Sequence, residues 1–190
     1  MAEGDSLRGH FLIAGSGLRD SKFYKSVVLM LEHNESGSMG LVINRPMDVT
    51  ISSALSEHFD IPESEHFLFC GGPVEPNALL ILHNSQEYDQ EHSPVVPGVY
   101  VGTSPDVFDK VVDSADDPDS SFAFRVFSGY SGWGAGQLEG EIGRGDWHVL
   151  PADREFVFRQ DPYEIWEDVL GEFHKSHRLF PGQPADPELN

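Results

Sequence analysis

The sequence is poor in cysteine, in basic residues and in long apolar runs, and each shortage excludes a class of protein. Cys70 is the only cysteine among 190 residues, which excludes an internal disulfide framework and every zinc site built from several cysteines. Only 12 lysines and arginines stand against 32 aspartates and glutamates, so the formal charge is −20 at pH 7. This balance argues against direct binding to nucleic acid, because neutralising phosphates needs a basic surface. The longest apolar stretches, such as residues 27–31, are too short to span a bilayer, and we expect no membrane contact.

What the sequence does contain is enough for one folded domain. Hydrophobic residues make up 39% of the chain and aromatic residues 11%, so a chain of this length can bury a core without metal or disulfide staples. We expect residues 9–180 to form that domain, between disordered ends at 1–8 and 181–190. The first residues are acidic and lack the pattern of a secretory signal, so the sequence predicts a cytoplasmic protein.

Short strands and a few helices follow one another without a regular order. Apolar and β-branched runs predict strands at residues 11–14, 27–32, 39–44, 67–70, 78–83, 99–101, 122–127, 147–150 and 155–158. Capping residues, prolines at the first helical position and apolar spacing predict helices at residues 51–57, 105–112, 135–141 and 162–173. Strands dominate and several join as hairpins, which favours an α+β fold: a single domain with a large, mostly antiparallel meandering sheet and helices packed against it.

The catalytic and cofactor signatures that can be tested are all incomplete. Residues 129–133 (GYSGW) resemble a nucleophile elbow, but the second glycine comes one position early. The glycine-rich run 132–136 is interpreted as a tight turn, with an anion site at the start of the next helix as the alternative. His174 and His177 could share one helix face, but Lys175 and Arg178 beside them favour a group of cations at a helix C-terminus over a metal site, and Cys70 fits a structural thiol. The sequence therefore predicts no catalytic residue, no metal site and no cofactor.

Five short segments stand in one order along nearly the whole chain. They are residues 9–14 (GHFLIA), 26–33 (SVVLMLEH), 40–46 (GLVINRP), 71–74 (GGPV), and 129–133 (GYSGW) with 136–139 (GQLE). Together they resemble the AlgH (YqgE) family of bacterial proteins, which has relatives in plants. The resemblance implies an α+β fold with a large meandering sheet and a cytoplasmic protein. The family is labelled a transcriptional regulator from a link to alginate production, which names a phenotype and no mechanism, so no catalytic residue is carried over.

Polar and aromatic residues inside these segments are the candidates for binding a ligand or partner. They are Glu32, His33, Asn44, Arg45, Tyr130, Trp133, Gln137 and Glu139. Arg45 could hold a carboxylate or phosphate through two hydrogen bonds, and Tyr130 and Trp133 could stack on a ring or anchor a partner. Each also has a structural interpretation. Arg45 could pair with Glu32 or Glu139, and Trp133 could belong to the core.

These residues predict a regulatory or binding protein that acts through a protein partner or a small anionic ligand rather than through direct DNA contact. The alternative is a hydrolase that uses Glu32, His33 or Glu139 as acid and base in a cleft with Arg45. Glu32 and His33 are adjacent on a strand and should point to opposite faces, which weakens that pair. The hydrolase hypothesis therefore needs a pocket that holds Glu32, Arg45 and Glu139 together.

Overall fold

The computed structural model describes residues 6–18, 20–56, 66–88, 93–102, 105–115 and 121–177. Most of the two ends expected to be disordered lies outside these residues. Ser6, Leu7 and Arg8 are described, and for them the expectation does not hold. Ser6 and Leu7 donate hydrogen bonds to His33, and the Arg8 guanidinium donates to two backbone carbonyls of residues 93–94, so polar contacts fix this segment.

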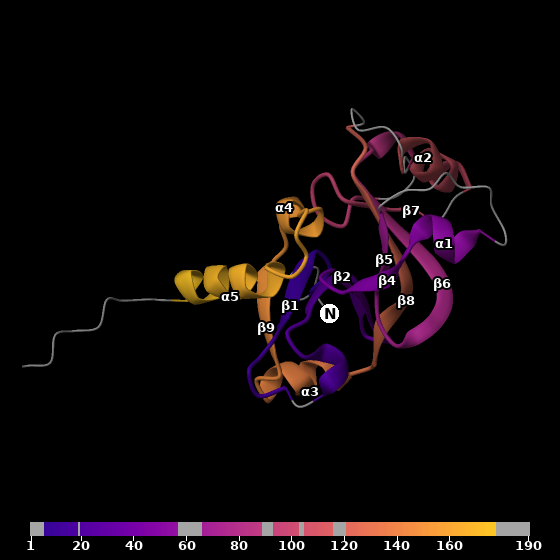
Figure 1. The fold of residues 1–190 in the computed structure, drawn as a ribbon. Helices are drawn as coiled ribbons and strands as arrows, with labels where there is room; N and C mark the ends of the chain where they lie inside the picture. The colour runs from indigo at the N-terminus through magenta and orange to yellow at the C-terminus, as the bar shows by residue number, and fades with distance from the viewer. Residues whose placement is uncertain are drawn as a thin grey trace, which may run out of the picture.

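One nine-stranded sheet forms the body of the molecule (Figure 1). Its strands are β1 (His10–Ala14), β2 (Val27–Asn34), β3 (Gly37–Val42), β4 (Pro46–Thr50), β5 (Phe67–Cys70), β6 (Val74–His83), β7 (Tyr100–Gly102), β8 (Phe124–Gly134) and β9 (Trp147–Pro151). The strand order is β4-β5-β8-β3-β2-β1-β9, with β6 also paired to β8, and β7 to β6. Among the described strands only β5 and β8 pair in parallel, which confirms the mostly antiparallel α+β fold.

Helices pack against this sheet at several places. The α-helices of the described residues are α1 (Ile51–Leu55), α2 (Pro105–Ala115), α3 (Gln137–Gly143), α4 (Arg154–Val157) and α5 (Ile165–Ser176), and 3-10 turns cover Ser21–Phe23 and Gln86–Tyr88. Helix α3 contacts β3, β8 and β9, whereas α5 contacts β1, β2 and β9. No described helix has the length and apolar character needed to cross a membrane.

Strand β2 lies between two hydrophobic cores. Val27 and Leu29 are fully buried in the core that also contains Ile165 of α5. Val28 and Met30 are fully buried in a second core on the other face. Because successive strand residues point to opposite faces, this covering of both faces explains why residues 27–31 are apolar without alternation.

Two segments differ from the sequence expectation. Residues 155–158, expected as a strand, lie mostly in helix α4, whose N-cap Asp153 accepts a hydrogen bond from the Glu155 N–H at 2.8 Å. Strand β4, which the sequence did not predict, begins at Pro46 after β3 has ended at Val42. Strand β4 is the last strand at its end of the sheet order, and proline is tolerated at the first residue of an edge strand because no ladder bond is lost there.

Candidate functional site

The structure separates the eight candidate residues rather than gathering them. His33, Trp133, Gln137 and Glu139 lie around helix α3, Asn44 and Arg45 lie in the turn after β3, Tyr130 contacts Glu75, and Glu32 is exposed. The first two groups are at opposite ends of β2. The Asn44 side chain bonds the Val27 N–H at the start of that strand, and His33 follows roughly 20 Å further along at about 3.3 Å per residue.

His33 joins the N-terminal segment to helix α3. Its Nδ1 accepts a hydrogen bond from the Leu7 N–H at 2.9 Å, and its Nε2 lies 3.0 Å from Glu139 Oε1. Since Nδ1 accepts, the proton of the neutral ring is assigned to Nε2, which donates it to the carboxylate. Hydrogen bonds from the Glu139 backbone N–H and from His33 lower the pKa of Glu139. This arrangement orients both side chains and ties the segment down.

Glu32 and His33 do not act as a pair. His33 is buried, whereas Glu32 is exposed on the other face of β2, opposite Met39 in the neighbouring strand. Arg45 lies at the far end of the strand from Glu139. The pocket that the hydrolase hypothesis needs is therefore not formed by the described residues.

Trp133 belongs to the core around helix α3, in agreement with its structural interpretation. The indole N–H groups of Trp133 and Trp147 both donate to Glu141 Oε2, each at 2.8 Å. Gln137 Nε2 donates to Glu141 Oε1 at 2.9 Å, and its own Oε1 accepts from the Gly134 N–H. Sequence reasoning missed Glu141 and Trp147. The four-residue spacing of Gln137 and Glu141 on a predicted helix is the signal that could have found them.

Most of the glycine-rich run 132–136, interpreted from sequence as a tight turn, is strand: Gly132, Trp133 and Gly134 end β8, and only residues 135–136 form the turn before α3. Gly136 has a φ of 73°, in the left-handed region that favours glycine. The alternative was an anion site at the start of the following helix. Glu139 stands in the first turn of α3, where its carboxylate accepts from its own backbone N–H, so a side chain already supplies the negative charge that this end attracts.

Tyr130 marks the place where two chain segments pass very close together. Its hydroxyl donates to Glu75 Oε1 at 3.4 Å, and partial burial together with the Glu75 charge raises the pKa of Tyr130. A Cβ atom on Gly72 would lie 2.3 Å from the Tyr130 backbone, and Gly129 has a φ of 69°. The glycines of GGPV and GYSGW therefore serve this close approach.

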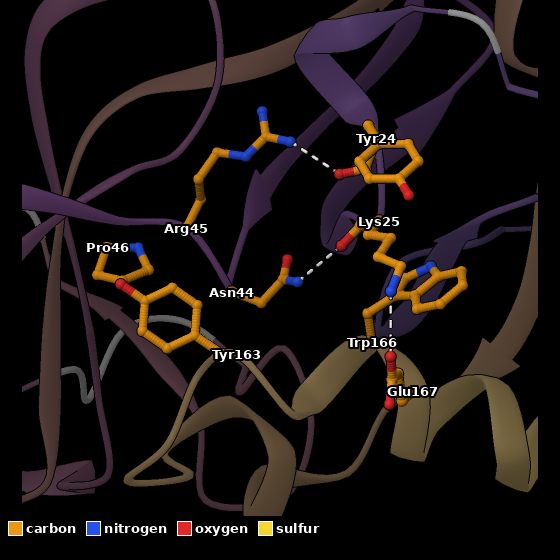
Figure 2. A pocket seen from close by; sticks show the side chains of 8 residues that line it. All are labelled: Tyr24, Lys25, Asn44, Arg45, Pro46, Tyr163, Trp166 and Glu167. Atoms are coloured by element: carbon orange, nitrogen blue, oxygen red, sulfur yellow. Dashed lines mark hydrogen bonds and ion pairs between the residues drawn. The ribbon is translucent and has the colours of Figure 1, made fainter.

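Asn44 and Arg45 open onto a hollow in the surface (Figure 2). Its volume is about 250 Å³, and it lies between the loop before β2, the turn that leads into β4, and the start of α5. Eight residues line it: Tyr24, Lys25, Asn44, Arg45, Pro46, Tyr163, Trp166 and Glu167. We call it the tyrosine-flanked hollow.

Asn44 and Arg45 build one wall of this hollow by holding the loop before β2. Asn44 Oδ1 accepts from the Val27 N–H at 2.9 Å, and its Nδ2 donates to the Lys25 carbonyl at 2.8 Å. The Arg45 guanidinium donates to the carbonyls of Lys22 and Tyr24, the latter at 3.0 Å. These bonds replace the carboxylate pairing considered for Arg45, and they engage two of its five N–H donors.

Lys25 crosses the opposite wall. Its backbone lies in the left-handed region, with a φ of 52°, which is uncommon for a residue other than glycine. Its Nζ lies 3.0 Å from Glu167 Oε1 and 4.9 Å from the centre of the Trp166 ring. The Trp166 indole N–H donates to the Ala14 carbonyl at 3.0 Å, so the ring under Lys25 is itself held in place.

Two exposed tyrosines flank the hollow, and sequence reasoning missed both. Tyr24 is 65% exposed and Tyr163 is 74% exposed, and they are two of the four large hydrophobic side chains that the described part of the chain leaves exposed. Tyr24 precedes β2 and Tyr163 precedes α5, so only the folded structure brings them to one place. No local motif could have indicated that proximity.

Comparison with known proteins identifies the family. A family model described as AlgH-like matches residues 11–178. The chain belongs to the AlgH-like family. Relatives in this family include a UPF0301 protein of Thioalkalivibrio sulfidiphilus, 39% identical over 88% of this chain and 89% of its own, and one of Myxococcus xanthus, 40% identical over 84% and 86%.

Solved structures agree with the AlgH-like fold. The solution structure of the AlgH protein from Pseudomonas aeruginosa has a TM-score of 0.72 and 28% identity, and the match covers 97% of this chain and 99% of that one. A crystal structure of a Corynebacterium diphtheriae protein, with 22% identity and a TM-score of 0.66 over 92% of this chain, shows the same fold. The family model and the sequence relatives establish the family, the two solved structures support the fold, and the chemistry must be argued from the site.

Proposed function

We propose that this AlgH-like protein is a binding protein that holds a small anionic ligand in the tyrosine-flanked hollow. Any regulatory effect would follow from that binding rather than from direct DNA contact, and the proposal includes the cytoplasmic location that the sequence predicts. One observation carries the proposal. The hollow is lined by two cations, Lys25 and Arg45, and one anion, Glu167, on a chain whose formal charge is −20. On a chain with this net charge, a hollow in which two cations face one anion is a favourable place to hold an anion.

Unused hydrogen-bond donors in the hollow support an anionic ligand. Arg45 uses two of its five N–H donors on backbone carbonyls, and Lys25 uses one of three on Glu167. Hydrogen bonds from cationic side chains to a carboxylate or phosphate are about twice as strong as neutral ones. Lys25 is already oriented, since Asn44 bonds its backbone carbonyl and its Nζ lies over the Trp166 ring, and Arg45 is oriented by its own bonds to backbone carbonyls. This orientation lowers the entropy cost of binding.

The hydrolase alternative has less support from the same geometry. Its acid and base candidates, His33 and Glu139, bond to each other around α3, and its cation, Arg45, is at the other end of β2. Direct DNA contact has the charge of the whole chain against it.

Titration of the protein with inorganic phosphate and with acetate at constant ionic strength tests the proposal. We expect either anion to shift the backbone NMR signals of residues 22–25, 44–46 and 163–167. Lys25→Gln removes one cation and should weaken binding about tenfold, since a charge-assisted hydrogen bond contributes about 1.5–3 kcal/mol. Lys175→Gln is the matched control, because Lys175 forms a comparable exposed ion pair with Glu172 on α5 and does not line the hollow. Signals that stay unchanged up to saturating anion would refute the proposal.

A further inference from the structure

We infer that the ligand of the tyrosine-flanked hollow carries one aromatic ring beside one anionic group, as a nucleoside monophosphate or an aryl phosphate does. The inference rests on the proposed function and names the chemical class of its ligand. It depends on the rings around the hollow, on where the charges stand relative to them, and on the size of the space.

The rings come from two segments that only the fold brings together: Tyr24 precedes β2, and Tyr163 and Trp166 lie around the start of α5. Figure 2 shows Tyr163 beside Pro46 on one side of Asn44 and Tyr24 on the other, with Trp166 nearby. A single exposed tyrosine needs no explanation, but two tyrosines that are 65% and 74% exposed around one hollow offer π faces to a planar group. Aromatic side chains of this kind hold bases by stacking without reading their edges.

Charge and ring surfaces meet in the same space. Lys25 Nζ lies 4.9 Å from the centre of the Trp166 ring, and the Arg45 guanidinium donates to the backbone carbonyl of Tyr24, whose side chain also lines the hollow. A ligand that stacks on a ring therefore brings a neighbouring anionic group within reach of a cation. A ligand with only one of these two features would contact either the rings or the cations of the hollow, but not both.

The hollow limits both the size and the charge of the ligand. A volume of about 250 Å³ lies just below the range of about 300–1,000 Å³ that is usual for drug-sized ligands, so one ring and one anionic group fit better than a dinucleotide. Glu167 adds a negative charge to the wall and opposes further anionic groups. We therefore expect a monophosphate to bind more tightly than a triphosphate.

The experiment compares a whole ligand with its two halves. The protein is titrated with AMP, phenyl phosphate, ribose 5-phosphate, adenosine and ATP, and binding is followed by the NMR signals of residues 22–25, 44–46 and 163–167. We expect AMP and phenyl phosphate to bind about tenfold more tightly than ribose 5-phosphate, because a stacked ring contributes about that much to affinity. We also expect AMP to bind more tightly than ATP and more tightly than adenosine.

Variants show whether the ring contact is made by tyrosine. Tyr163→Ala should weaken AMP binding about tenfold and leave ribose 5-phosphate binding unchanged, while Tyr163→Phe keeps the ring and should keep the affinity. Phe67→Ala is the matched control, because Phe67 is 51% exposed and does not line the hollow. Tyr163 is exposed and donates only its backbone N–H, to Asp161, so its substitution leaves the fold intact.

The outcomes separate this inference from the proposed function. Equal affinity for AMP, phenyl phosphate and ribose 5-phosphate would overturn the aromatic class and leave the anion site standing. If Tyr163→Ala weakened the binding of AMP and of ribose 5-phosphate equally, the aromatic class would also be overturned, because Tyr163 would then not be contacting the aromatic ring of the ligand. Failure of every anion to shift these signals would overturn both proposals.

Discussion

Replacing Glu141 by alanine should destabilise the fold more than any other change to an acidic side chain around α3. One of its carboxylate oxygens accepts the indole N–H groups of Trp133 and Trp147, both at 2.8 Å, and the other accepts from Gln137. Trp133 is only 6% exposed and Trp147 only 2%. Glu141→Ala would therefore leave two indole donors near the core without their acceptor, and helix α3 would lose its hydrogen bonds to Trp133 of β8 and Trp147 of β9.

The size of the effect follows from the number of bonds. A hydrogen bond to a charged group contributes about 1.5–3 kcal/mol, so losing two would cost about 3–6 kcal/mol. Glu141 is itself only half-buried, and water can enter the space that alanine leaves, so we expect the lower end, about 3 kcal/mol. This is a large share of the 5–15 kcal/mol by which most domains are stable. Glu141→Gln keeps an acceptor but loses the charge, and should cost about half as much.

Urea unfolding followed by far-ultraviolet circular dichroism measures this cost without relying on tryptophan fluorescence, which the substitution itself would change. Glu172→Ala on α5 is the control. Glu172 is exposed and pairs only with Lys175 on the same helix, so its loss should stay within about 0.5 kcal/mol. A free-energy loss below about 1 kcal/mol in Glu141→Ala, with an unchanged slope against urea, would refute the reasoning, because the indoles would then not depend on the shared carboxylate.

Two further predictions concern histidines. The pKa of His148 is lowered by burial and by the neighbouring His174 and His177, and the His148 ring is stacked 4.5 Å from the Phe173 ring. The unfolded chain therefore binds a proton at His148 more readily than the folded protein does. The free energy of unfolding should therefore fall as the pH drops below about 6.5. Between pH 7.5 and 5.5 the melting temperature should fall less in His148→Gln than in the unchanged protein, and an equal fall in both would contradict this prediction. His33→Ala removes the acceptor of the Leu7 N–H, and hydrogen exchange at Leu7 should speed up about tenfold while exchange in β9 stays unchanged.

Much of the fold could be predicted because local patterns determine it. The apolar run of β2 and the amphipathic helices α2 and α5 carry their signal within a few residues, although α5 begins at Ile165 without a side-chain cap rather than at the expected residue 162. Residues 155–158 were mispredicted because three apolar residues in four fit a strand and a short helix equally well, and the cap at Asp153 decided between them. Strand β4 was missed because its tolerance of Pro46 depends on lying at a sheet edge, which is a property of the whole fold.

The candidate site was harder to predict than the fold. Asn44 and Arg45 were among the candidates because they lie in a family-like segment, but their hydrogen bonds to the loop before β2 depend on pairing between β2 and β3. Tyr24 and Tyr163 follow no motif, because each is an isolated residue next to the start of an element. Physical reasoning from sequence finds residues that lie in the same strand or helix. The residues that line a hollow are far apart in the sequence and come together only in the folded structure.

The segment of residues 40–46 therefore has a structural role that comes before any binding role. Asn44 and Arg45 form hydrogen bonds with the backbone of residues 22–27, and these bonds hold one wall of the tyrosine-flanked hollow. Because the Arg45 bonds end on backbone carbonyls, this wall does not depend on which side chains stand at the rim. Tyr24 and Tyr163 lie at that rim, outside the family-like segments, and in the proposed function they determine which ligand is held. For the same reason rim substitutions test binding more cleanly than Arg45→Ala, which would disturb the wall itself.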